Sequence, residues 1–270
     1  MPLIRPARTA LLLSIALCSL PATAALDLTR ADENLSALVK MRCSIDPKEN
    51  VVTWLKSTIF AQLPAEAPSA ILGFGGYNIC RMGPLEDGSW RFIARELSFY
   101  RDLASGRLLD TWANPVTGKT NTVIHVANDP VNNLFGSKRH HGSPNIYPWT
   151  GGGGDLLMTF NAPLTDAHPL PPKDFPEESS AGVYAGSEHF MFLTPRASID
   201  DTSVHNSPAS YGWTRIGPWP PWIKMGTHEG SLLYIAQGPK LGGSAELPAD
   251  MQALIEAKYP EVASAPAAQS

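Results

Sequence analysis

One candidate for acid–base chemistry is a glutamate in the segment 183–193. Alternate residues of an extended strand share a face, which places Glu188 beside Tyr184, Phe190 and Phe192. A carboxylate among aromatic rings is poorly solvated, so its pKa rises and it suits proton transfer near neutral pH. The alternatives are a solvent-facing position or an ion pair with an arginine.

A second acid shows the same pattern on the segment 90–100. Glu96 shares its face with Trp90, Phe92 and Tyr100. Two aromatic-flanked acids favour a polar site inside an aromatic cavity. Arginines on or beside the same segment are the alternative explanation, because they would neutralise this acid elsewhere.

An arginine and a histidine complete the candidate chemistry. Arg215 shares a face with Tyr211 and Trp213, where its guanidinium would bind an acidic or oxygenated ligand or pair with one of the two acids. His125 lies in the apolar stretch 123–127 and has the side chain best suited to acid–base work at neutral pH. The alternative for His125 is a hydrogen-bonded core histidine.

The N-terminus has the three parts of a secretory signal. Arg5 and Arg8 precede an apolar run over 10–20, and small residues at 22–24 predict cleavage after Ala24. The apolar run is about half the ~20 residues that a membrane span requires. We therefore expect a soluble periplasmic or secreted protein with no membrane span.

Cleavage there leaves two cysteines, Cys43 and Cys80. In an oxidising compartment they pair, or they are two small buried hydrophobic residues, and the sequence leaves both open.

Several chemistries lack their motifs. His140 and His141 are adjacent, and neither His-x-x-x-His nor Cys-x-x-Cys occurs, which argues against a metal. Gly-x-Ser-x-Gly, the motif of a serine-hydrolase nucleophile, is absent. The glycine run at 73–76 precedes a strand rather than a helix, and the run at 151–154 is not followed by Lys-Ser/Thr, so neither is a nucleotide-binding loop. With a net charge of −4 and no dominant basic cluster, nucleic acid is not an expected partner. We expect no cofactor, and a small molecule as the partner.

The elements that position these residues are mostly strands. Helical spacing predicts short helices over about 30–41 and from Pro248 to just before Pro260. Residues 132–153 are predicted to form a long loop. Turn signals separate nine strand-like segments: 51–63, 70–82, 90–103, 107–113, 121–127, 155–162, 183–193, 210–216 and 231–237.

Tight turns between consecutive strands predict an antiparallel, all-β meander. Closure hides strand edges, so we expect a closed or nearly closed lipocalin-like β-barrel, with a two-sheet sandwich as the alternative. We assign residues 1–24 to the signal, 25–262 to a single domain and 263–270 to a disordered tail.

Several segments together resemble one known family. They are GGYN at 75–78 and onward through Tyr100, LDTWANP at 109–115, HVANDPVN at 125–132, WTRIGPW at 213–219 and PWIKMG at 221–226. The family is catalogued as domain of unknown function 1838, found in bacteria and fungi. The resemblance covers most of the mature chain and implies one domain, but no assigned activity or catalytic residues. The two cysteines lie outside the pattern, so a disulfide would be particular to this protein.

These observations lead to a functional hypothesis. We expect a cofactor-independent lyase, isomerase or cyclase for a small, hydrophobic, oxygenated molecule, with proton transfer by Glu188 or His125 and with Arg215 polarising an oxygen. A carrier that uses the same aromatic cavity without catalysis is the alternative, and a structural envelope protein is a third possibility. The expected substrate contacts are Trp213, Tyr211, Tyr184, Phe190, Asn128, Asp129 and Glu96.

Overall fold

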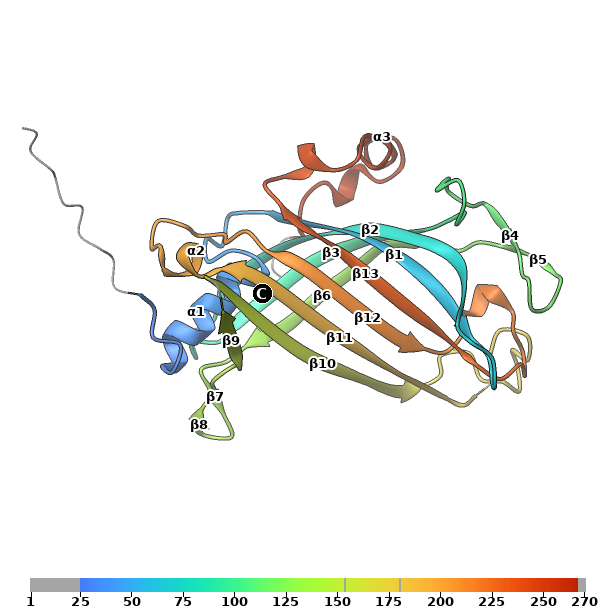
Figure 1. The fold of residues 1–270 in the computed structure, drawn as a ribbon, viewed down its shortest axis with the longest axis horizontal. Coiled ribbons are helices and arrows are strands. Elements are labelled where there is room, and N and C mark those ends of the chain that lie inside the picture. Colours follow the sequence, from blue (N-terminus) through green and yellow to red (C-terminus); the bar gives the residue numbers. More distant parts are fainter. Residues whose placement is uncertain (1–24, 153, 180, 267–270) are drawn as a thin grey trace, which may run out of the picture.

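The computed structural model describes residues 25–152, 154–179 and 181–266. The expected signal at 1–24 lies outside these residues. The described chain is mostly antiparallel β, built around a nine-stranded sheet in the order β6-β3-β2-β1-β13-β12-β11-β10-β9 (Figure 1). Its strands are β1 Val51–Gln62, β2 Ser69–Pro84, β3 Trp90–Arg101, β6 Val126–Gly136, β9 Trp149–Gly152, β10 Asp155–Ala167, β11 Val183–Pro195, β12 Ser210–Gly217 and β13 Ser231–Leu241.

The sheet consists of two meanders. Strands β1 to β3 pair in chain order, and β9 to β13 do the same. The first strand of one meander then pairs antiparallel with the last strand of the other, from Val52↔Leu241 to Gln62↔Ser231. The predicted antiparallel meander is therefore confirmed within each half. The β1–β13 ladder that joins the halves is a long-range pairing that turn signals do not predict.

The segment 107–113 is not a strand of the main sheet, contrary to the prediction. Only β4 (Thr111–Ala113) is extended, and it pairs with β5 (Thr120–Thr122) in a separate hairpin. The hairpin docks elsewhere, because the Asn114 and Asn121 side-chain amides both donate to the carbonyl of Ile223, at 3.2 and 2.6 Å. Ile223 ends the 3₁₀ turn η1 (Pro221–Ile223).

The predicted long loop over 132–153 is also wrong in part. Strand β6 runs on to Gly136 along the edge of β3, and β9 pairs with β10. A small hairpin of β7 (Arg139–His140) and β8 (Ser143–Pro144) separates them. The prolines and glycines of this segment are typical of loops, and for this reason the sequence did not predict these strands. Both are edge strands, where a residue such as Pro130 breaks no ladder on its open side.

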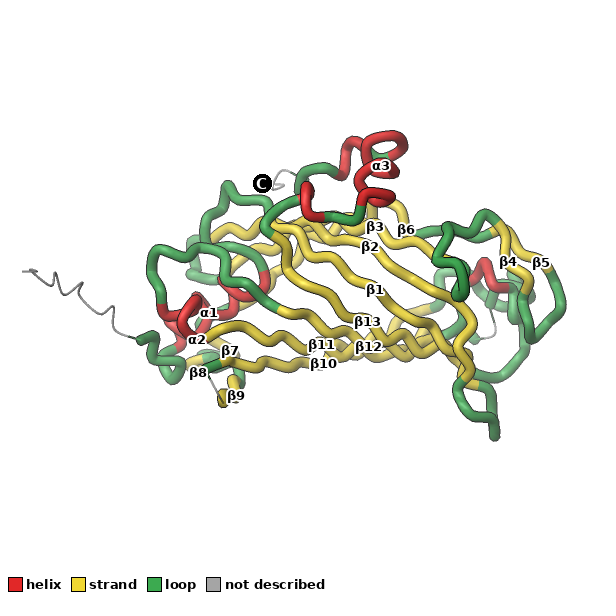
Figure 2. The backbone as a smooth tube through the Cα atoms, turned by 45° about the horizontal axis from the view of Figure 1, so that its top comes forward, coloured by secondary structure: helices red, strands yellow, loops and turns green. Residues whose placement is uncertain are grey.

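The sheet curls strongly around its concave face (Figures 1 and 2). The ring centroids of Phe92 on β3 and Phe192 on β11 lie 4.6 and 5.9 Å from the same guanidinium carbon, that of Arg42. These strands are five positions apart in the sheet, which would separate them by about 24 Å if the sheet were flat. Helix α1 (Ala31–Arg42) fills this end of the curl.

Aromatic residues fill the opposite end of the concave face. Trp219 and Trp222, in the turn after β12, are each 6% exposed and pack with Trp112 of the β4–β5 hairpin and Ile59 of β1. The turn is thus a packed corner. The two ends leave the middle of the concave face to the polar residues described below.

The outer face of β1 to β3 is covered by α3 (Ala249–Lys258), in the predicted place. Met251 and Ile255 pack there against Tyr77 and Leu97. The expected disordered tail does not include 263–266, because Ala265 is buried and its carbonyl accepts a hydrogen bond from Arg81. Residues 267–270 lie outside the described chain. The remaining short helices are α2 (Arg196–Asp200), η2 (Ser244–Glu246) and η3 (Pro260–Val262).

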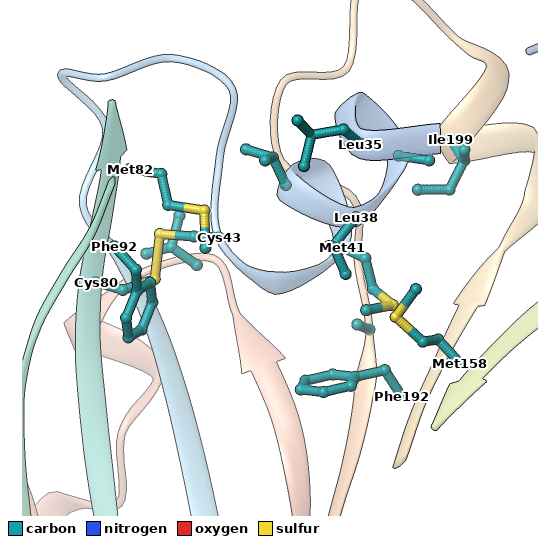
Figure 3. Packing of buried hydrophobic residues seen from close by; sticks show 14 of the residues in the cluster. Leu35, Leu38, Met41, Cys43, Cys80, Met82, Phe92, Met158, Phe192 and Ile199 are labelled. Atoms are coloured by element: carbon teal, nitrogen blue, oxygen red, sulfur yellow. A yellow bond between two sulfur atoms is a disulfide. The ribbon is translucent and has the colours of Figure 1, made fainter. Parts of the chain in front are cut away.

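The two mature cysteines form a disulfide. Cys43, just after α1, is joined to Cys80 of β2 with a Cα–Cα distance of 6.2 Å. Both residues are fully buried beside Met82 and Phe92 (Figure 3). Of the two states that the sequence left open, the structure therefore contains the disulfide.

Candidate functional site

Glu188 and Arg215 are brought together on the concave face. They are direct cross-strand neighbours on β11 and β12, and Arg215 Nη1 donates to Glu188 Oε1 at 3.2 Å. Arg215 Nη2 also donates to the Tyr184 hydroxyl. The side chains of Glu188 and Arg215 are 17% and 29% exposed, so solvent reaches both members of the pair.

The electrostatics of Glu188 are a balance of opposing effects. Burial raises the pKa of Glu188 above its usual value, while the charge of Arg215 and hydrogen bonds from Trp213 and Arg215 act to lower it. The burial effect is larger. Glu188 is therefore a stronger base than a solvated glutamate, held next to a fixed cation.

Two further tyrosines extend the polar group around Arg215. Burial raises the pKa of Tyr234 on β13 and of Tyr100 on β3, and each side chain interacts with the other and with the charge of Arg215. A raised pKa keeps both phenols protonated at neutral pH, so they remain hydrogen-bond donors. Arg215 thus lies among three phenols and one carboxylate.

Aromatic rings line the same face. Phe190 stacks on Phe160 with centroids 4.6 Å apart, and its centroid is 6.2 Å from that of Tyr211. Trp213 packs against Tyr234 at 5.6 Å. Phe160 is 37% exposed, so this surface is open to an apolar molecule. Four expected substrate contacts, Trp213, Tyr211, Tyr184 and Phe190, therefore share one face.

Glu96 faces this interior from β3. Its Oε1 accepts a hydrogen bond from Asn78 Nδ2 of β2 at 2.9 Å. Burial raises the pKa of Tyr211; the charge of Arg42 lowers it, and Glu96 and Glu188 raise it. Tyr211 is thus within electrostatic range of both acids from opposite parts of the curled sheet.

His125 is placed differently from the other two expected catalytic residues. Its Nδ1 accepts a hydrogen bond from the backbone N–H of Tyr100 at 3.1 Å, at the edge of β3, and its ring lies 5.1 Å from that of Phe99. Burial lowers the pKa of His125 and so favours the neutral imidazole. Within the described chain, no hydrogen bond or ion pair joins it to Glu188 or Arg215.

Two expected contacts remain without a structural account. The backbones of Asn128 and Asp129 lie in β6, where Asp129 pairs with Glu96. The side chains of both residues lie outside the described part of the structure.

Three residues that face this interior were not predicted from the sequence, whereas Tyr100 was expected on the face of Glu96. Arg42 comes one and two helical turns after Leu38 and Leu35, on the apolar face of α1, so helical spacing would have identified it. The other two are Asn78 and Tyr234, which lie on the concave side of their strands. Local periodicity does not show which strands face one another across the curl.

The described residues contain neither a cluster of metal-ligating side chains nor a membrane-spanning helix. In the described residues, no three His, Cys, Asp or Glu side chains gather as a group that could hold a metal ion. None of the helices in the described ranges combines the length and the apolar character needed to cross a bilayer.

Comparison with known proteins identifies a family. No curated protein matches the sequence. The model of the family described as protein of unknown function (DUF1838) matches residues 48–270, which is most of the chain and includes β1 to β13 and α3. The resemblance seen in the sequence motifs is thereby confirmed: the chain belongs to the family of proteins of unknown function DUF1838.

Proposed function

We propose that this protein is an exported, soluble, cofactor-independent enzyme for a small hydrophobic molecule that carries an oxygen function. The Glu188–Arg215 pair on an aromatic, partly solvent-exposed concave face is the observation that carries the proposal. The Cys43–Cys80 disulfide supports export, because disulfides persist mainly in oxidising compartments.

The proposed binding space is the interior of a nearly closed barrel. The sheet order has two ends, β6 and β9, but the contacts of Arg42 with both Phe92 and Phe192 support a tight curl. A two-sheet sandwich, in which two halves of the sheet face each other, stays the alternative. Either arrangement turns the aromatic face inward.

The proposed chemistry is proton transfer next to a carbonyl. Glu188 removes a proton from carbon, and the electron pair moves onto the carbonyl oxygen, which Arg215 and the Tyr184 hydroxyl hold by donated hydrogen bonds. Return of the proton to another carbon gives isomerisation, and loss of a leaving group gives elimination. His125 acts indirectly, by holding the backbone of Tyr100.

The proposal is tested by hydrogen–deuterium exchange at carbon, followed by NMR in a panel of enones and aryl ketones. We expect Glu188→Gln to slow exchange at least a hundredfold, since a positioned general base contributes about 10²–10⁴. Glu256→Gln, on the exposed side of α3, is the matched control and should behave as wild type. If Glu188→Gln and His125→Ala both leave exchange untouched, the catalytic proposal fails.

The second candidate is a carrier that binds the same kind of molecule without turning it over. The observation that favours it is the Glu188–Arg215 ion pair, in which each charge already neutralises the other. An interior that only holds a ligand needs its buried charges paired in this way. A carrier would bind members of the panel without exchange in the wild type, and Phe190→Ala would weaken that binding.

A further inference from the structure

The guanidinium of Arg42 lies in an unusual position. Arg42 is the last residue of α1, and its guanidinium carbon is 4.6 Å from the ring centroid of Phe92 and 5.9 Å from that of Phe192. The two rings extend from opposite sides into the space next to the end of α1 (Figure 3). Arg42 therefore reaches the concave interior between two distant strands.

No described residue supplies an acceptor for this guanidinium. Among the described residues, no hydrogen bond or ion pair reaches its side chain, although a guanidinium has five N–H donors. Glu96 acts on it only at longer range, and one oxygen of Glu96 accepts from Asn78. Contacts with two phenyl rings stabilise a cation but leave its in-plane donors unused.

The other charged or hydroxyl-bearing side chains near Arg42 in the described chain do not supply an acceptor either. Arg215 and Glu188 bind each other, and Tyr211 contributes a hydroxyl whose raised pKa keeps it uncharged. Lys240 donates to backbone carbonyls around the end of α1. An additional anion is therefore the missing partner, and planar carboxylates fit the guanidinium fork best.

We infer that Arg42 binds the carboxylate of the ligand, so that the molecule bound in the interior is a hydrophobic carboxylic acid. Its apolar body lies along Phe192, Tyr211 and Phe190, and its second oxygen function meets Arg215. The inference rests on the proposed function, because it places the ligand in the same interior. Arg42 precedes the family-matched residues 48–270, so acid recognition belongs to a part of the chain outside that match.

The experiment compares two probes of nearly the same shape, the anion 4-phenylbutyrate and the neutral 4-phenylbutanamide, by calorimetric titration. We expect the wild type to prefer the acid by about tenfold to a hundredfold, the contribution of a charge-assisted hydrogen bond. In Arg42→Met this preference disappears while amide binding is unchanged. Arg107→Met, an exposed arginine outside the interior, is the matched control and keeps the preference.

The outcomes separate this inference from the proposed function. Equal binding of acid and amide by the wild type, or an acid preference that survives in Arg42→Met, overturns the role of Arg42 and leaves interior binding intact. Binding of neither probe overturns the inference about Arg42, and the exchange experiment with enones and aryl ketones then decides the proposed function separately. Glu188→Gln should lose exchange but keep the acid preference. If Arg42→Met does not fold, Arg42→Lys decides: a preference reduced severalfold supports the inference, and an unchanged one contradicts it.

Discussion

At the scale of single residues, Glu188 combines two opposing influences whose balance is measurable. Burial raises its pKa, and Arg215 acts to lower it. We expect the pKa of the Glu188 carboxyl to lie above that of a solvated glutamate, and to rise further in Arg215→Met, which removes the opposing charge. Carbon-13 NMR of the Glu188 carboxyl measures both, with glutamate in a short unstructured peptide as the reference. A wild-type midpoint at or below that of the peptide would contradict the burial argument.

The same shift sets the sign of a pH effect on stability. A carboxyl whose pKa is raised by folding binds more protons in the folded than in the unfolded state, so stability falls as the pH rises from the unfolded pKa through the folded one. Glu188→Gln should remove this slope from urea unfolding curves, and should therefore gain relative stability on the alkaline side of that window.

Residue types and period-two spacing predicted much of the candidate site. Glu188, Arg215 and Glu96 were each selected because a strand gives alternate residues one face, and all three face the interior. The expected trio with His125 depended instead on which strands meet across the curl. His125 instead accepts a hydrogen bond from the backbone of Tyr100 at the edge of β3. The residues around His125 in the sequence do not indicate that position.

At the scale of elements, the end of α1 is held by a lysine from a strand far away in the sequence. Lys240 Nζ on β13 lies within hydrogen-bond distance of the carbonyl oxygens of Lys40, Met41, Cys43 and Ser207, at 2.7, 3.1, 2.5 and 3.0 Å, and shares its N–H donors among these four acceptors. Cations at a helix C-terminus satisfy carbonyls that have no partner within the helix.

Replacing this lysine should therefore loosen α1. We expect Lys240→Met to lower the free energy of unfolding by about 3 kcal/mol, since several buried carbonyls lose their donor. Urea unfolding measures the loss. Lys56→Met, an exposed lysine on β1, is the matched control with little change expected. Equal stability of the two variants would show that water replaces the ammonium at no cost.

The disulfide fixes the same helix end to β2. It closes a loop with a sequence separation of 37, for which chain entropy gives about 4 kcal/mol of stabilisation. We expect dithiothreitol to lower the midpoint of urea unfolding in the wild type and to have no effect on the Cys43→Ser/Cys80→Ser variant, which starts at the lower value. A wild-type midpoint that does not respond to full reduction would contradict this role.

At the scale of the whole molecule, local signals predicted the elements better than their assembly. Turn dipeptides and the alternation of apolar and polar residues predicted most of the strands, because turns and strands depend on residues that are neighbours in the sequence. The edge strands over 132–153 were missed, and the strand order depends on the β1–β13 ladder between residues far apart in the sequence, such as Val52 and Leu241, which are 189 positions apart. Burial of both meanders against α1 and the aromatic corner decides that assembly, and no local pattern encodes it.

Gly238 of β13 lies directly against the backbone of β1, and this gives a test of the whole assembly. A Cβ added to Gly238 would lie 1.8 Å from the Trp54 carbonyl oxygen and 3.0 Å from Leu55 Cα. Since backbone cannot move aside as a side chain does, Gly238→Ala must push the two meanders apart where they join, at a cost of about 3 kcal/mol.

The control for that substitution is another strand glycine, because a Cβ on Gly83 meets nothing within 4 Å. Gly83→Ala should change the free energy of unfolding by less than about 0.5 kcal/mol. Urea unfolding with tryptophan fluorescence compares the two variants, and 4-phenylbutyrate titration reports whether the interior keeps its shape. If Gly238→Ala matches Gly83→Ala in both measurements, close contact between the meanders is not what holds the curled sheet and its interior together.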